Sequence, residues 1–139
     1  MTNILDKIPP ILLVGFGGMI GAILRYLVSN SFQDTRPIPL GTLIVNVIGS
    51  FALGAIITLY TLEIIESTLI PLLGIGIMGS FTTMSSFAVE TMTLSDESLG
   101  LASINLILMV LLVLVGVFLG RLVIYILFSQ CNLVASLNY

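Results

Sequence analysis

A short run of hydroxyl residues near the middle of the sequence holds the groups best suited to chemistry. Within about two helical turns, Gly79 is followed by five hydroxyl side chains: Ser80, Thr82, Thr83, Ser85 and Ser86. A hydroxyl can donate to the carbonyl four residues earlier and glycine weakens a helix, so the run favours a break in the helix. A break frees carbonyl dipoles that can replace the water around an ion. The run therefore predicts an ion-binding site.

The flanking sequence indicates that this site lies inside a membrane. Of 139 residues, 58% are hydrophobic and only 8% are charged, which is too little charge to cover a globular surface. Irregular backbone at membrane depth persists only where protein or a water-filled cavity satisfies it. We therefore expect one all-α integral membrane domain, residues 1–139, with a broken third helix. Its four spans, each near the roughly 20 residues that a bilayer requires, are about 9–28, 40–62, 70–93 and 101–128.

The missing residue types argue against several classes of function. The sequence has no His, one Cys and no CxxC pair, so the usual catalytic and zinc-binding constellations are missing and an enzyme is not expected. The net charge of −3 is small and spread out, which argues against a nucleic-acid-binding surface. The expected surroundings are a lipid bilayer.

A few small or polar residues stand out within the spans. Gly17 and Gly21 form a GxxxG step, which lets another helix approach closely. Arg25, near the end of the same span, either extends to the membrane interface or forms a structural or functional pair. Asn46 lies in the middle of an apolar helix and must face protein or a polar pathway; an interhelical hydrogen bond is the alternative to a pathway role. Glu90 is expected at a vestibule, or as a solvated acid at a helix end.

The distribution of basic residues bears on topology. Four spans place both termini on one side of the membrane, with a loop at residues 95–98 between the last two spans. Lys7 and Arg121 then lie on the side of the termini, and Arg25 and Arg36 lie on the opposite side. Such an even division gives no positive-inside bias. It predicts insertion in both orientations and an antiparallel dimer whose two-fold axis lies in the membrane plane.

Three sequence blocks together resemble the CrcB-type (Fluc) fluoride channels. They are the glycine-rich segment 17–26, the segment 41–54 around Asn46, and the segment 79–91 with its hydroxyl cluster. The resemblance covers nearly the whole chain. It implies a dual-topology dimer in the cell membrane, with two anion pores and a structural Na⁺ at the central two-fold axis. The implied function is passive export of toxic cytoplasmic fluoride.

The resemblance also assigns roles to individual residues. The Na⁺ ligands would be the backbone carbonyls of Gly79 and Thr82 from both subunits. The pore asparagine corresponds to Asn46, whose NH₂ group can donate to a dehydrated anion, and the two pore phenylalanines correspond to Met84 and Phe87. The positive edge of an aromatic ring suits an anion. The hydroxyls that remain for the pore are Thr83, Ser85 and Ser86.

The sequence departs from the family at two places that line the pore. Met84 replaces an aromatic residue, and a thioether has no comparable positive edge. The fourth span usually carries a track of hydroxyls, but residues 106–114 are entirely apolar here. These departures predict that the chain alone conducts fluoride weakly and that full activity requires a paralogous partner. The working dimer is then either homomeric or heteromeric.

Two other functions fit a small four-span protein. One is a non-conducting or auxiliary subunit, whose glycines simply pack helices; Asn46 and the broken third span are the features that distinguish a channel from it. The other is a proton-coupled small multidrug transporter, which needs a carboxylate within the membrane to exchange protons for a cation. The first span contains no acidic residue, so this transporter class is disfavoured.

Overall fold

The computed structural model describes residues 7–32 and 37–137, with side chains described as far as residue 130. Within these ranges every regular element is helical, which confirms the all-α prediction. Four helical stretches are long and apolar enough to cross a membrane: Pro10–Asn30, Leu40–Thr61, Ser67–Glu97 and Leu99–Gln130. The elements are α1 (Pro10–Asn30), α2 (Leu40–Thr61), η2 (Ser67–Leu69), η3 (Pro71–Met78), α3 (Gly79–Phe81), α4 (Met84–Glu97) and α5 (Leu99–Leu137).

Prolines mark the starts of three of these elements. Pro10 is the first residue of α1, Pro39 precedes α2, and Pro71 begins η3. Proline fixes φ near the helical value and lacks an N–H, and the first N–H groups of a helix have no intrahelical acceptor in any case. The prolines therefore start these helices at little cost in hydrogen bonding.

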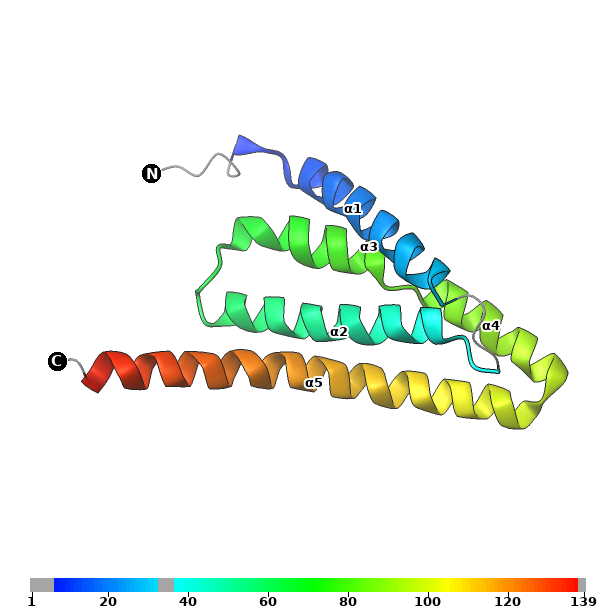
Figure 1. Cartoon of the computed structure of the whole chain (residues 1–139). Coiled ribbons are helices and arrows are strands. Elements are labelled where there is room, and N and C mark those ends of the chain that lie inside the picture. The colour runs from blue at the N-terminus through cyan, green and yellow to red at the C-terminus, as the bar shows by residue number, and fades with distance from the viewer. Residues whose placement is uncertain (1–6, 33–36, 138–139) are drawn as a thin grey trace.

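The helices form a bundle in which α1 and the third span, η3 with α3, run in one direction, and α2 and α5 run in the opposite direction (Figure 1). α1 packs mainly against η3 and α3, whereas α2 packs mainly against α5. α1 begins and α5 ends at the same end of the bundle (Figure 1). At the opposite end α4 diverges from the bundle axis and leads into the start of α5, against which it also packs.

Glycines allow the backbones of both helix pairs to approach closely. A Cβ added at Gly17 would overlap the carbonyl oxygen of Leu72, and one added at Gly21 would overlap that of Ile77. In the other pair, a Cβ at Gly120 would overlap the carbonyl oxygen of Phe51. Such contacts are possible only without a side chain, because a carbonyl oxygen of a packed helix cannot move aside. The structure thus uses Gly17 and Gly21 to hold α1 against the third span.

The third span is broken, as the hydroxyl cluster predicts. Its first part, η3, has the wider π-helical hydrogen-bonding pattern and continues into the single turn α3. At Thr82 (φ −72°, ψ 153°) and Thr83 (φ −147°, ψ 113°) the backbone becomes extended before α4 begins. The break lies near the middle of the span Ser67–Glu97.

The connection between the last two spans differs from the prediction. The sequence suggests a loop at residues 95–98, but α4 continues through Glu97 and only Ser98 is extended (φ −161°, ψ 120°). The Ser95 hydroxyl donates to the Met92 carbonyl at 2.7 Å, so this polar residue is accommodated within the helix. The hydroxyl of Ser98 accepts from the N–H of Leu101 at 3.5 Å and caps α5. A single residue therefore makes the turn between the last two spans.

Candidate functional site

The broken segment is held from α2 by the side chain of Asn46. Its Oδ1 accepts a hydrogen bond from the Thr83 N–H at 2.8 Å, and its Nδ2 donates to the Thr83 carbonyl at 3.0 Å. Both residues are buried. The amide therefore replaces a section of helical backbone pairing at the point where the third span is extended. Because an amide nitrogen carries two hydrogens, one hydrogen of Nδ2 remains beyond the bond to Thr83.

Two backbone carbonyls lose their usual helical donors at the break. In a continuous α-helix the Thr83 N–H would donate to the Gly79 carbonyl, but here it donates to Asn46. The Ser86 N–H would likewise donate to the Thr82 carbonyl, but here it donates to the Thr83 hydroxyl at 3.3 Å. Gly79 is exposed at the surface of this chain and Thr82 is half-buried.

A group of hydroxyls surrounds the start of α4. The Thr83 Oγ1 lies 3.2 Å from the Ser85 Oγ and 3.1 Å from the Ser86 Oγ. Thr83 is buried, Ser86 is half-buried and Ser85 is exposed. The N-terminus of α4 and its hydroxyl donors therefore face a common space.

This space is an open cavity of about 390 Å³ whose lining includes Arg25 together with Thr83, Ser85 and Ser86. The remaining described lining residues are Ala22, Tyr26, Ser29 and Asn30, so no acidic residue lines the cavity within the part of the chain that the structure describes. A guanidinium and several hydroxyls around one cavity attract anions. We refer to Arg25, Asn46, Thr83, Ser85 and Ser86 as the polar wall.

An apolar cluster lies beside Asn46 on α2. Leu43, Phe87 and Met109 form a buried cluster, and Val47 and Val113 pack against it. The Phe87 ring is 5% exposed and Met109 is 4% exposed, so these side chains are close-packed. We refer to these five residues as the apolar wall. Met84, in contrast, is 72% exposed and lies outside this cluster.

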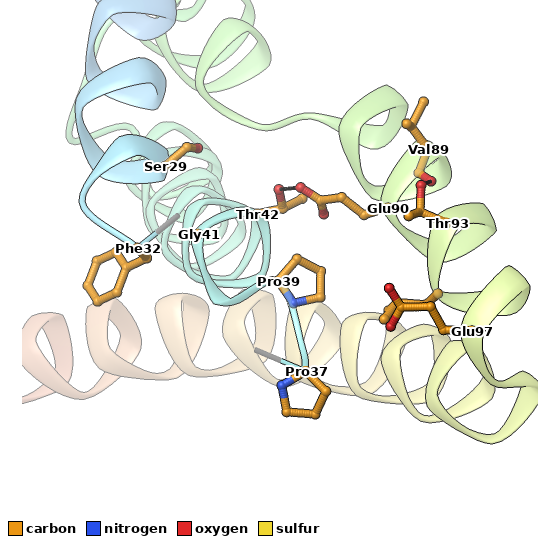
Figure 2. Close-up of a pocket in the computed structure, with 11 residues that line it drawn as sticks. Ser29, Phe32, Pro37, Pro39, Gly41, Thr42, Val89, Glu90, Thr93 and Glu97 are labelled. Atoms are coloured by element: carbon orange, nitrogen blue, oxygen red, sulfur yellow. Dashed lines mark hydrogen bonds between the residues drawn. The ribbon is translucent and has the colours of Figure 1, made fainter. Parts of the chain in front are cut away.

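A second cavity, of about 430 Å³, lies beside α2 and α4 at the end of the bundle near the start of α2 (Figure 2). The Thr42 hydroxyl donates to Oε1 of Glu90 across this cavity. Oε2 of Glu90 is buried without a hydrogen-bond partner. The Glu90 carboxylate is therefore half-buried, and only one of its oxygens has a hydrogen-bond partner. Its bond to Thr42 joins α4 to α2 at a point one helical turn along α2 from Asn46.

Two residues of this region, Thr42 and Asn105, were not predicted as site residues from the sequence. Asn105 is fully buried, and its Nδ2 donates to the Thr91 Oγ1 at 2.9 Å. The Thr91 hydroxyl in turn donates to the Phe87 carbonyl at 2.8 Å. Helical spacing identifies Thr42, because it precedes Asn46 by four residues and so shares its helix face. No local pattern connects Asn105 with Thr91, because their contact depends on how α4 packs against α5.

Comparisons with known proteins agree on one family. Residues 12–121 match the family model described as "CrcB-like protein, Camphor Resistance (CrcB)". A protein of Shewanella frigidimarina named "Fluoride-specific ion channel FluC" is 43% identical over 128 residues, which is 90% of this chain and 98% of that protein. "Fluoride-specific ion channel FluC 1" of Methanosarcina acetivorans is 43% identical over 132 residues, 92% of this chain and 95% of that protein.

The four apolar helices and these relatives, which are named as ion channels, define a multi-pass membrane protein and not an enzyme. Because the family model covers most of the chain and the relatives align over nearly their full lengths, the chain belongs to the CrcB family. This confirms the family that the three sequence blocks indicate.

Proposed function

We propose that this chain is a subunit of a fluoride-specific channel in the cell membrane, which lets cytoplasmic fluoride leave passively. One observation carries the proposal: a break at mid-span that is clamped by Asn46 and opens on a cavity lined by Arg25 and hydroxyls. The names of the relatives support fluoride as the ion. Fluoride is strongly hydrated, so a narrow path must replace its water with protein donors.

The polar wall offers such donors one after another along the proposed ion path. The Arg25 guanidinium raises the local concentration of anions in the cavity. The hydroxyls of Ser85 and Ser86 can rotate to donate to an anion that reaches the N-terminus of α4, where the helix dipole also favours negative charge. The remaining Nδ2 hydrogen of Asn46 is the next donor. The fluoride ion is thus passed from a charged group to neutral hydroxyls and then to an amide.

The residues at the break also fit a structural Na⁺. The carbonyls of Gly79 and Thr82 have each lost the N–H that a helix would supply, and neutral carbonyl oxygens can replace the hydration shell of a hard cation. When bound, Na⁺ would be coordinated by these carbonyl oxygens and would take the place of the missing N–H donors. Because Gly79 is exposed on this chain and lipid cannot satisfy a carbonyl, we propose that a second subunit, inserted in the opposite orientation, completes the site.

A specific observation favours the alternative of a heteromeric channel with this chain as an auxiliary subunit. Leu43, Phe87 and Met109 of the apolar wall are buried and Val47 and Val113 pack against them, and the wall offers no hydrogen-bond donor to a dehydrated anion. A paralogous partner with an aromatic residue at the position of Met84 and hydroxyls on its last helix would complete one pore. The homodimer would then conduct weakly.

Reconstitution into liposomes tests the proposal. Liposomes that contain the purified chain should release fluoride faster than chloride, and fluoride efflux should fall when Na⁺ is replaced by a large organic cation. Equal release of fluoride and chloride would contradict the assignment of fluoride as the ion.

Terminal reporter fusions test the proposed orientation of the subunits. Both orientations should occur, and adding Lys residues to one loop should bias them. A single orientation for every copy would contradict the homodimer and would leave only a pair of oppositely inserted paralogues.

A further inference from the structure

We propose that two side chains, the amide of Asn46 and the hydroxyl of Thr83, create the cation site by keeping its carbonyl ligands free. The inference rests on the Na⁺ site proposed above and identifies the residues that maintain it. Asn46 is then a positioning residue for the cation as well as an anion donor. It links the anion path to the centre of the dimer.

At the break, one side-chain acceptor for each proposed ligand carbonyl binds the N–H group that this carbonyl would receive in a continuous helix. Asn46 Oδ1 accepts a hydrogen bond from the Thr83 N–H at 2.8 Å; in an α-helix this N–H would donate to the Gly79 carbonyl. Thr83 Oγ1 accepts a hydrogen bond from the Ser86 N–H at 3.3 Å; in an α-helix this N–H would donate to the Thr82 carbonyl. These two carbonyls are the pair that the Na⁺ site requires. Without the two acceptors, the N–H groups could return to the carbonyls and close the helix.

α2 enforces this arrangement from outside the third span. Asn46 Nδ2 donates to the Thr83 carbonyl at 3.0 Å and thereby holds Thr83 extended. Gly49, almost one turn further along α2, leaves room for Thr82, because a Cβ at this glycine would overlap the Thr82 methyl group. The clamp and the space beside it come from one face of α2, so the position of α2 determines whether the carbonyls stay free.

Substitutions at Asn46 and Thr83 can distinguish the effect of the hydrogen-bond acceptor from the effects of the donor and of side-chain shape. Asn46→Asp keeps an oxygen that accepts from the Thr83 N–H but removes the amide donor. Asn46→Leu has a similar size and removes both groups. Thr83→Ser keeps the capping hydroxyl, whereas Thr83→Val keeps the shape of the side chain and removes the acceptor. The inference therefore predicts different effects on cation binding within each pair.

The test is a Na⁺ titration of the thermal unfolding midpoint of the purified full-length protein in detergent, with N-methylglucamine keeping the ionic strength constant. A cation that binds only the folded dimer raises this midpoint with its concentration. Thr83→Val and Asn46→Leu should weaken the apparent Na⁺ affinity at least tenfold, about 1.4 kcal/mol. Thr83→Ser should stay within about threefold of the unmodified protein, which is roughly 0.7 kcal/mol on the same scale. Asn46→Asp keeps the acceptor but loses the donor that holds Thr83 extended, so its affinity should lie between that of Asn46→Leu and that of the unmodified protein.

Thr58→Val, on α2, is the matched control. It removes a buried hydroxyl that donates to the Gly54 carbonyl at 2.8 Å, while leaving both carbonyl ligands and both side-chain acceptors in place. Its Na⁺ affinity should be unchanged. A loss as large as that of Thr83→Val would overturn the inference, because general loosening of the bundle would then explain both results.

The remaining outcomes separate this inference from the site on which it rests. Unchanged Na⁺ affinity in Thr83→Val would refute the inference and leave the Na⁺ site standing. No stabilisation of the unmodified protein by Na⁺ would refute the site itself. If Asn46→Leu does not assemble, Thr83→Val decides the matter, because it preserves the shape of the replaced side chain.

Discussion

The polar wall and the apolar wall meet at α2 but offer an anion very different surroundings. Asn46 and Thr42 lie on one face of α2 and bond to Thr83 and Glu90. Leu43 and Val47, displaced by one position along the same helix, pack against Phe87 and its neighbours. A rotation of about 100° around one helix thus separates a hydrogen-bonded surface from a close-packed one.

This difference indicates which part of the protein limits transport. The polar wall can exchange water for protein donors, whereas an anion passing the apolar wall would lose water and gain at most the ring edge of Phe87 in return. We infer that this chain supplies one competent side of a fluoride path. Breaking the polar wall should therefore reduce efflux strongly, and adding donors to the apolar wall should increase it.

The largest effect is expected where α1 holds the polar wall in place. In Gly21→Ala the added methyl would overlap the Ile77 carbonyl oxygen, so α1 must move away and carry Arg25 out of the cavity. We expect destabilisation of about 3 kcal/mol, at the upper end for overpacking, and loss of efflux. Denaturant titration and efflux assays measure both. Gly15→Ala is the control, because nothing lies within 4 Å of its added methyl; equal damage there would contradict the account.

Changing the charge of the polar wall at its centre should have the next largest effect. Asn46→Asp places a carboxylate where fluoride must pass, which should lower efflux about 100-fold, equivalent to about 2.7 kcal/mol of barrier. The measurement is the initial rate of fluoride release from liposomes. A variant that conducts normally would show that Asn46 is not an anion donor.

Adding a donor to the apolar wall should increase transport. Met109→Ser introduces a hydroxyl beside Phe87 and should raise efflux by the chain alone about tenfold, while lowering stability by about 2 kcal/mol through the space it opens. Leu111→Ser is the control, since Leu111 is 55% exposed on the same helix and its hydroxyl should leave efflux unchanged. An increase in both variants would mean that the position of the hydroxyl does not matter.

The smallest effect is expected at the entrance to the polar wall. Arg25→Gln should lower efflux about threefold at low salt, and the difference should shrink at high salt because ions screen the attraction of the guanidinium. Efflux measured at several ionic strengths tests this. Arg121→Gln, on the exposed surface of α5, should have no such salt-dependent effect.

The sequence predicts the elements of this fold well because their signals are local. Four apolar stretches separated by polar segments indicate four spans, and glycine followed by hydroxyls indicates the break. The prediction of a loop at residues 95–98 is wrong because the Ser95 hydroxyl donates to the Met92 carbonyl and α4 continues through Glu97. A polar residue near a helix end does not by itself terminate the helix.

The contacts of the site depend on tertiary packing and could be predicted only in part. The position of Asn46 in an apolar helix shows that it needs a partner, but the identity of that partner, the backbone of Thr83, follows from how α2 lies against the third span. The bond between Asn105 and Thr91 has the same origin. The apolar character of residues 106–114 is visible in the sequence, whereas the packing of Met109 against Phe87 is not.

The most direct test of this account is the rate of fluoride efflux from liposomes that contain the purified chain alone, measured beside the Met84→Phe variant. Met84 is 72% exposed on this chain, so an aromatic ring there could present its positive edge to an anion. We predict slow, Na⁺-dependent, fluoride-selective efflux from the unmodified chain and faster efflux from the variant. Fast efflux from the unmodified chain, equal to that of Met84→Phe, would contradict the claim that one wall of this channel is incomplete.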